Sequence, residues 1–419
     1  MTLFMMLFVT ASSVYGQNIE FTKEFFKEDK EGLKKAKDNI ELGDTYYSQG
    51  TIFFKQAIDP YLEANKFNPN NALLNFKIGQ CYLYSNFKLK ATPFLEKAKS
   101  LNASVDPTLS FYLGRAYHLD MQWDKAIAEF SIFQKNGKSI NECYAGKELS
   151  QKPIRVFIDN LGKEVNSQYT DYGPVISADE SVLLFTSRRP NTVGGRIDPG
   201  LNEYFEDIYI SYKQADGKWS SAANMGEPVN TEDHDANSGL SADGTKFLIY
   251  IGKNNGDLYE SELLGDKWSK PEAMNKNINT DKFHESSACY SPDGNSVYFV
   301  SDKPDGLGSR DIWISHKDEK GKWGKAENLG PTVNTKYGEE GVFIHPDGKT
   351  LYFSSQGHKG IGGYDIFKTI YNDSTKTWST PENIGYPVNT PDDDVFFVVS
   401  ASGRHGYYTS FNPNGFGEK

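Results

Sequence analysis

The chain has 419 residues, which at roughly 100–200 residues per domain corresponds to two or three domains. Aromatic residues make up 14% and hydrophobic residues 37%, a content that excludes a chain disordered throughout. The net charge of −11 argues against nucleic acid as the main partner. Three widely separated cysteines fit neither a disulfide framework nor a clustered metal site, so we expect free, mostly buried thiols.

A short apolar run, Leu3 to Val9, opens the chain and is followed by small and polar residues. It is too short to span a membrane, which takes about 20 apolar residues, and it fits the apolar core of a secretory signal. We therefore predict a signal peptide at residues 1–17, although no Lys or Arg precedes the run; a buried helix start is the alternative. Since no later segment is long and apolar enough, we expect an exported, periplasmic protein with no transmembrane segment.

Residues 38–138 contain three similar units at intervals of 36 and 35 residues. Each unit places a glycine after an aliphatic residue and three positions before a tyrosine. The three copies are Leu42/Gly43/Tyr46, Ile78/Gly79/Tyr82 and Leu113/Gly114/Tyr117. A second helix follows in each unit, and the small glycine lets the two helices approach closely. We also expect a lead-in segment at 18–37 and a closing helix near 139–151.

This pattern resembles the tetratricopeptide repeat. The resemblance implies a helical solenoid over residues 38–151, with a concave face that binds peptides or partner domains. The alternative is that the helices form only a spacer, because each unit needs its neighbour to bury its apolar face.

The character of the sequence changes near residue 150. Residues 18–151 carry 18 basic and 17 acidic side chains, whereas residues 152–419 carry 27 and 39. The later part alternates short β-branched and aromatic runs with Gly, Pro, Asn and Asp, as strands and turns do. We therefore predict a domain boundary near 150 and an all-β domain over 152–419.

Four signatures recur in this β-rich part with a period near 54 residues. The first is a hairpin turn, often Asp-Gly, in which glycine accepts positive φ. Its copies are Ser177–Glu180, Ser241–Gly244, Ser291–Gly294, His345–Gly348 and Ser400–Gly403. The second is an Asp-aliphatic-aromatic strand, at Asp207–Tyr209, Asp257–Tyr259, Asp311–Trp313 and Asp365–Phe367. The third is a lone tryptophan, at Trp219, Trp268, Trp323 and Trp378.

The fourth signature is an Asn-x-Gly element that ends in Val-Asn-Thr. Its copies are Asn224–Thr231, Asn328–Thr335 and Asn383–Thr390, with a weaker one at Met274–Thr280. A fifth copy, Asn160–Ser167, precedes the first hairpin. Antiparallel sheets escape exposed edges by closing into a ring. We therefore predict a β-propeller closed by a strand at Pro153–Asp159, with five blades favoured over six.

These signatures resemble the WD40-like propeller repeats of the TolB type. Together with the helical repeats they resemble Bacteroidetes envelope proteins that combine tetratricopeptide repeats, a propeller and a peptidoglycan-binding OmpA-like domain, among them a component of the type IX secretion system. The resemblance implies an α + β multidomain protein at the periplasmic face of the outer membrane. The sequence stops where the next strand is expected, so we predict a truncated last blade and no OmpA-like domain; peptidoglycan would then be reached only through that missing domain.

An acidic residue follows each Asn-Thr or Asn-Ser pair and precedes the next inner strand. The five predicted binding residues are Asp171, Asp235, Glu285, Glu340 and Asp394. Because inner strands line the channel of a propeller, we expect these carboxylates around one mouth of the ring, where they would hold a hard cation or attract a basic peptide. The alternative is that each caps a turn or pairs within its own blade.

No catalytic pattern stands out. The histidines His234, His284 and His345 lie in different blades without ligand spacing, so we expect no metal site and no cofactor. The Gly-x-Ser-x-Gly elbow of hydrolases is absent, whereas paired carboxylates for glycoside cleavage are invisible in a sequence. We predict a non-enzymatic scaffold that binds envelope proteins or peptides within a secretion or envelope-assembly complex. The alternatives are a carbohydrate-active or peptidase propeller enzyme, and a glycan- or cation-sensing module.

Overall fold

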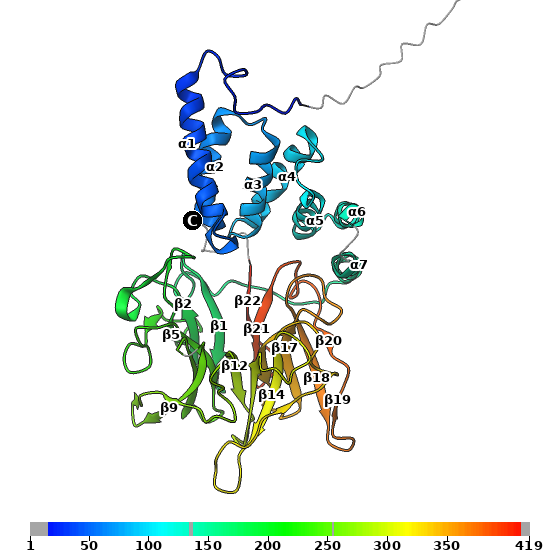
Figure 1. Cartoon of the computed structure of the whole chain (residues 1–419). Coiled ribbons are helices and arrows are strands. Elements are labelled where there is room, and N and C mark those ends of the chain that lie inside the picture. Colours follow the sequence, from blue (N-terminus) through cyan, green and yellow to red (C-terminus); the bar gives the residue numbers. More distant parts are fainter. Residues whose placement is uncertain (1–15, 134–136, 254, 412–419) are drawn as a thin grey trace, which may run out of the picture. The chain divides into compact units, whose positions relative to one another are not determined.

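The computed structural model describes residues 16–133, 137–253 and 255–411 (Figure 1). The described residues form two compact units: residues 16–120 with 128–133, and residues 121–127 with 137–253 and 255–411. The predicted signal peptide falls almost wholly outside the described residues. Among the residues described, no helix has the length and apolar character needed to cross a membrane.

The first unit is helical. Its helices are α1 (Lys30–Tyr47), α2 (Phe54–Phe67), α3 (Ala72–Leu83), α4 (Ala91–Leu101), α5 (Leu109–Leu119) and the later part of α6 (Trp123–Phe133). Local chemistry sets where two of them begin, because Asp29 accepts a hydrogen bond from Gly32 N at 2.7 Å and Asn71 accepts one from Leu74 N at 2.9 Å. Such side chains satisfy backbone N–H groups that the first helical turn leaves unpaired.

The three repeated glycines lie where paired helices cross. A Cβ atom on Gly43 would lie 2.4 Å from the Tyr61 ring, on Gly79 2.5 Å from Leu95, and on Gly114 2.8 Å from the Phe130 ring. Each glycine of a first helix thus faces a buried side chain of the second. The predicted helical region is confirmed. The regular spacing of the glycines in the sequence follows from this close approach of the helices, which recurs in each pair. The closing helix α7 (Gly137–Ser150) belongs to the second unit.

Replacing Gly79 with alanine tests the close approach. The added methyl group would collide with Leu95, which is fully buried, so overpacking should lower the free energy of unfolding by about 1–3 kcal/mol. The gain of about 1 kcal/mol in helix propensity only partly offsets this. Helical circular dichroism during denaturation measures the effect. Gly137→Ala, which meets no atom within 4 Å, is the control, and equal stability of both variants would contradict the packing argument.

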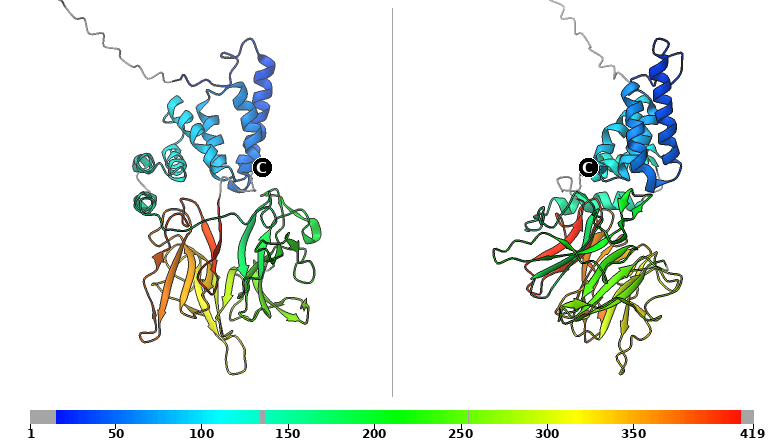
Figure 2. Two further views of the ribbon diagram at one scale, coloured as in Figure 1. Left: turned by 180° about the vertical axis from the view of Figure 1, so that it is seen from behind. Right: turned by 90° about the vertical axis from the view of Figure 1, so that its left-hand side faces the viewer.

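The second unit contains four large antiparallel sheets (Figures 1 and 2). The first has the order β1 (Asp171–Ile176), β2 (Val182–Ser187), β5 (Asp207–Tyr212) and β6 (Ala223–Asn224). The second comprises β7 (Asp235–Leu240), β8 (Lys246–Ile251), β9 (Asp257–Leu264), β10 (Lys267–Trp268) and β11 (Glu272–Ala273). The third comprises β12 (Glu285–Tyr290), β13 (Ser296–Ser301), β14 (Asp311–His316) and β15 (Glu327–Asn328). The fourth comprises β16 (Glu339–Ile344), β17 (Thr350–Ser355), β18 (Asp365–Asn372), β19 (Thr377–Trp378) and β20 (Glu382–Asn383).

Two smaller pairs complete the β structure of the described residues. The strands β21 (Asp394–Val399) and β22 (Gly406–Ser410) form a hairpin, and β3 (Ile197–Asp198) pairs with β4 (Glu203–Tyr204) inside the insertion that follows β2. All five predicted hairpin turns are present. The fourth residue of each turn has positive φ; these residues are Glu180, Gly244, Gly294, Gly348 and Gly403.

The sheets follow one another around a propeller-like ring. The first strand of each sheet contacts the first strand of the next, and β21 contacts both β16 and β1. Apolar residues fill the space between neighbouring sheets, as where Leu184 and Ile208 of the first sheet pack with Phe247 and Ile249 of the second. The propeller-like arrangement is confirmed, with four complete blades and the β21–β22 hairpin between the fourth and the first. The count of five blades stays a prediction.

The predicted closing strand is wrong. Residues 153–159 carry no strand, and the backbone bond from this segment runs from Ile154 N to Tyr386 O at 2.8 Å, beyond β20. The strand fails to form there because the segment meets the connection after the fourth sheet instead of the edge of β22. The residues 415–419, from which we inferred a truncated blade, lie outside the described part of the chain.

Candidate functional site

The predicted acidic residues begin the inner strands of the ring. Asp171, Asp235, Glu285 and Asp394 are the first residues of β1, β7, β12 and β21, but the corresponding residue of β16 is Glu339, and Glu340 follows it. Each of these first residues accepts a hydrogen bond from the backbone N–H of the preceding Ser or Thr, as Asp235 does from Thr231 at 2.5 Å and Glu339 from Thr335 at 3.1 Å.

Burial separates these carboxyl groups from solvent and from one another. Asp235, Glu285, Glu339 and Asp394 have no exposed surface. They act as turn caps, which is the alternative we had considered for them. A cation- or peptide-binding role for the set stays a prediction, and Glu340 alone among the five has side-chain partners on a neighbouring sheet. Within the residues described, no three His, Cys, Asp or Glu side chains are grouped to hold a metal ion.

Burial also changes how these groups titrate. Loss of solvent raises the pKa of Asp235 to about 7, against the hydrogen bonds from Thr231. It raises the pKa values of Glu285 and Glu339 to about 7 as well, against hydrogen bonds from Ser and Thr hydroxyls. The folded state therefore holds protons in a pH range where the unfolded chain, with carboxyl pKa values of about 4, has lost them.

This difference predicts how stability depends on pH. The contribution of each group is complete below pH ~4 and is lost as the pH rises through ~7, because the folded pKa lies above the unfolded one. In Asp235→Asn the amide oxygen still accepts from Thr231 N, so stability should fall less between about pH 5 and pH 8 than in the wild type. Urea unfolding at both pH values measures this. Asp216→Asn, a half-exposed loop control, should match the wild type, and equal slopes for both variants would contradict the prediction.

A different set of polar residues gathers at the end of the sheets where the inner strands begin. We call Arg188, Glu206, His234, Tyr250, His284, Arg310 and Glu340 the polar cluster. Strand register brings Arg188 and Glu206 together. Ser187 of β2 lies opposite Asp207 of β5, and Arg188 follows Ser187 while Glu206 precedes Asp207 in the sequence. The next sheet starts beside them, because Asp235 N donates to Glu206 O at 2.9 Å.

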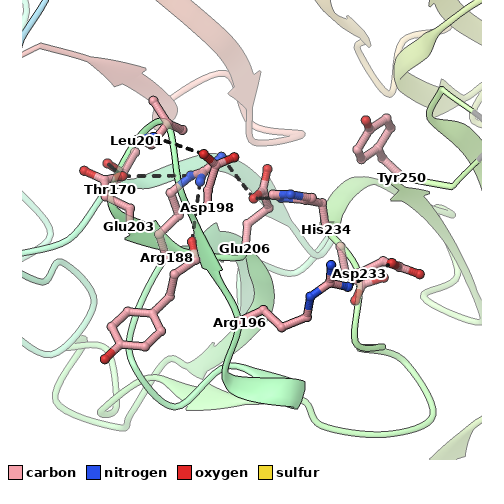
Figure 3. Close-up of polar contacts among 12 residues, drawn as sticks. Thr170, Arg188, Arg196, Asp198, Leu201, Glu203, Glu206, Asp233, His234 and Tyr250 are labelled. Carbon is pink, nitrogen blue, oxygen red and sulfur yellow. Dashed lines mark hydrogen bonds and ion pairs between the residues drawn. The ribbon is translucent and has the colours of Figure 1, made fainter. Parts of the chain in front are cut away.

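Glu206 is the centre of the first half of the polar cluster (Figure 3). Its carboxylate accepts from Arg188 at 3.0 Å and is bonded to Nδ1 of His234, with 9% of the Glu206 side chain exposed and 26% of that of His234. Burial opposes ionisation of Glu206, but the bond to His234 and the charge of Arg188 outweigh it and lower the pKa. Phe205 stacks on the His234 ring at 3.7 Å between centroids.

The insertion after β2 supports this half of the cluster. Its β4 strand carries Glu203, which lies 4.0 Å from Arg188 and accepts from the Thr170 hydroxyl at 3.0 Å (Figure 3). Arg196 of the same insertion covers Phe205 at 4.6 Å. The insertion is thus folded against the cluster.

Glu340 is the centre of the second half. It accepts from Arg310 at 2.7 Å, from the Ser286 hydroxyl at 2.8 Å and from the Ser287 hydroxyl at 2.7 Å, all three on the third sheet or its connections. The side chain of Arg310 is 39% exposed, whereas that of Glu340 is 8% exposed. The carboxylate is therefore held inside while part of the guanidinium reaches solvent.

Tyr250 joins the two halves. Its hydroxyl lies 3.2 Å from Nε2 of His284, and burial raises its pKa with further contributions from the charges of Glu206 and Glu340. Burial, followed by the charge of Arg310, lowers the pKa of His284, which favours a neutral imidazole. The cluster therefore presents two ion pairs, a histidine held by a carboxylate and a neutral histidine beside a phenol.

Sequence reasoning found Glu340 and missed most of this cluster. A usable signal existed, because Glu206, Arg310 and Tyr364 each stand directly before an Asp-aliphatic-aromatic strand. The first residue of the next inner strand donates its N–H to their carbonyl groups. They therefore occupy equivalent places at one end of the first, third and fourth sheets. His234 and His284, which precede inner strands of different sheets, belong to the same end.

The opposite end of the inner strands is apolar. A cavity of about 110 Å³ is lined there by residues of all five inner strands and their hairpins, including Val175, Leu240, Cys289, Ile344 and Val398. The three cysteines are free and buried, as predicted. Polar ligand chemistry is therefore concentrated at the end of the strands that carries the polar cluster.

No protein-family model matches the chain, and no curated protein matches it. Solved structures with similar folds include an α-L-arabinofuranosidase from Lactobacillus brevis (14% identity, TM-score 0.37, 60% of this chain and 84% of that one). They also include a gluconolactonase from Xanthomonas campestris (12%, 0.36, 61% and 84%) and a puromycin hydrolase (13%, 0.33, 58% and 36%). The chain spans about a third of the length of the puromycin hydrolase.

The prediction that the chain is not an enzyme is corrected by this comparison. The similar structures named above are enzymes, so the absence of a linear motif was no ground for excluding an activity. The physical reason is visible in the polar cluster, whose members come from separate sheets and share no short sequence pattern. At these identities and TM-scores the likeness bears only on the fold and indicates no particular reaction.

Proposed function

We propose that the second unit binds a glycan at the polar cluster. The observation that supports this most is the presence of two Arg–Glu pairs, Arg188 with Glu206 and Arg310 with Glu340, at the same end of the ring. Each pair offers donors and acceptors side by side, and its charges largely cancel. A hydroxyl group both donates and accepts, so a hydroxyl-rich ligand matches such pairs better than a ligand with net charge.

Aromatic side chains near the pairs add to this match. The Tyr172 hydroxyl lies 3.3 Å from Glu206, and the charges of Glu340 and Arg310 act on Tyr364. Binding sites for small molecules combine apolar or aromatic surface with a few placed polar groups. Tyr172, Tyr250 and Tyr364 would supply that surface for the faces of sugar rings.

Thermal denaturation with a panel of neutral and acidic oligosaccharides tests the proposal, because a ligand that binds only the folded state raises the midpoint. Arg310→Met should weaken the best ligand at least tenfold, since it removes the exposed donor of the second pair. Glu262→Gln, which alters an exposed ion pair with Lys246, is the control and should bind as the wild type does. Stabilisation by peptides but by no oligosaccharide would contradict a glycan ligand.

The same cluster has the means for proton transfer on the bound glycan. A carboxylate that holds Nδ1 of an imidazole fixes its tautomer and leaves Nε2 for exchange with a ligand. The Glu206–His234 pair has this form. The assay measures whether reducing ends are released from an oligosaccharide that binds. If His234→Gln abolishes this release but still binds the oligosaccharide, the result supports a carbohydrate-active enzyme over a binding module.

A second candidate function concerns the helical unit, which we propose binds partner proteins or peptides of the cell envelope. The observation behind it is Leu42: it is 48% exposed, whereas its repeat equivalents Ile78 and Leu113 are buried. As part of this proposal, the helices are tetratricopeptide repeats and the second unit is a propeller of five WD40-like blades. The protein is exported to the periplasm and is associated with the outer membrane in a secretion complex.

Replacement of Leu42 with glutamate tests this second function. A partner that packs on the exposed end of the helical array should lose affinity, because a charge would replace apolar contact area. Quantitative cross-linking in envelope extracts compares the variant with the wild type, and Lys218→Glu in an exposed turn of the second unit is the control. An unchanged set of cross-linked proteins would contradict the use of this surface.

A further inference from the structure

An irregularity recurs near the start of the inner strands. In β1, β16 and β21 the register with the second strand of the sheet shifts after the second residue. The backbone there enters the left-handed region, with a φ of 64° at Gly173, 60° at Gly341 and 58° at Phe396. Glycine adopts such a φ freely, whereas for a bulky residue it is an outlier that strains the backbone. Phe396 is therefore a strained residue at a place where two other inner strands carry glycine.

Phe396 also departs from the repeat in size. The third residue of the other inner strands is small or polar: Gly173 in β1, Asn237 in β7, Ser287 in β12 and Gly341 in β16. A Cβ atom on Gly341 would lie 2.8 Å from Phe396 N and 3.0 Å from Phe396 Cα, so β16 and β21 approach too closely there for a second side chain. Strained residues persist only where their surroundings hold them, and they cluster at ligand sites.

The Phe396 ring lies beside the polar cluster. Its centroid is 5.9 Å from that of Tyr172, whose hydroxyl donates to the Glu206 carboxylate at 3.3 Å. Phe396 and Tyr172 are both half-buried. The adjacent Phe397 packs elsewhere, because its ring centroid is 5.1 Å from that of Tyr352 on β17. Contact through one tyrosine thus connects the Phe396 ring with the centre of the first half of the cluster.

We propose that Phe396 is the stacking surface of the glycan site, and that the site selects sugars in the pyranose form, such as glucose and xylose units. This inference rests on the proposed function and narrows its ligand class. A pyranose of this kind carries C–H groups on its faces and hydroxyl groups at its edge. One face packs on an aromatic ring while the hydroxyl groups remain free for placed polar partners. Phe396 supplies the apolar contact, and the Arg188–Glu206 pair supplies the donors and acceptors.

Replacement of Phe396 with glycine separates a role in binding from a role in folding. Glycine accepts a φ of 58° without strain, so the relief of strain offsets the packing that is lost with the ring. The fold should therefore tolerate the change. A ligand that stacks on the ring would lose that contact and bind more weakly.

The experiment uses the full chain and isothermal titration calorimetry with cellotriose, xylotriose and sorbitol, an open-chain polyol that has no ring face. Phe396→Gly should weaken binding of the trisaccharides about tenfold, as expected for the loss of one aromatic contact. Its thermal midpoint should be unchanged or higher. Phe396→Tyr, which keeps the ring, should bind the trisaccharides as the wild type does, and sorbitol should bind wild type and variants equally weakly.

Phe397→Gly is the matched control, because it removes the neighbouring ring, which packs on Tyr352. It should lower the thermal midpoint and leave trisaccharide affinity unchanged. Unchanged affinity in Phe396→Gly would overturn the inference, and so would a loss of stability as large as that in Phe397→Gly, since the ring would then be structural.

The failure of this inference can be told apart from the failure of the proposed function. A wild-type chain that binds neither trisaccharide but is stabilised by another oligosaccharide overturns the ligand class alone. A wild-type chain that no oligosaccharide stabilises overturns both.

Discussion

The ring depends on one joint, the Asn-Thr pair that ends each Asn-x-Gly element. Asn230 bonds the backbone of β5 in the sheet just completed, while the neighbouring Thr231 bonds Asp235, which starts the next sheet. Two adjacent residues thus tie two sheets together with buried hydrogen bonds. Because unpaired buried polar groups cost free energy, the loss of either partner would weaken such a joint.

The joint gives the repeated acidic residues a structural role. The Glu339 carboxylate, for example, accepts hydrogen bonds from the backbone N–H and the hydroxyl of Thr335 inside the ring. Residues that recur in every blade hold the ring together. Glu206, Arg310 and Tyr364 differ at equivalent places, so their side chains are not fixed by that task.

This distinction sets what the sequence could predict. The glycine period, the hairpin turns and the order of helices before sheets could all be predicted, because each depends on local chemistry that repeats. The acidic residue of the fourth blade was misplaced by one position, at Glu340 instead of Glu339, since two adjacent glutamates satisfy the same spacing. In a strand that shift moves a side chain to the other face, and here it separates a turn cap from a residue with partners on the preceding sheet.

The polar cluster could not be predicted from spacing, because its contacts follow from register between strands far apart in the sequence. Arg188 meets Glu206 because β2 and β5 pair up to Ser187 and Asp207, and Glu206 meets His234 because β7 starts beside it. The prediction of the closing strand was wrong for a related reason. The strand propensity of a segment does not determine which sheet edge the segment pairs with. Residues 153–159 have the composition of a strand, but the backbone group they bond is Tyr386 O.

The two ends of the ring differ because the inner strands begin and end in different ways. Each begins at a joint, where a buried carboxyl group and the residue before the third strand bring polar side chains together. Each ends in a hairpin whose polar side chains bond within the turn itself, as Ser241 does with Asp243, and the apolar strand residues beside the hairpins line a cavity. The polar cluster therefore lies at the end of the ring where the inner strands begin, beside the joints that connect the sheets, and the apolar cavity lies at the other end.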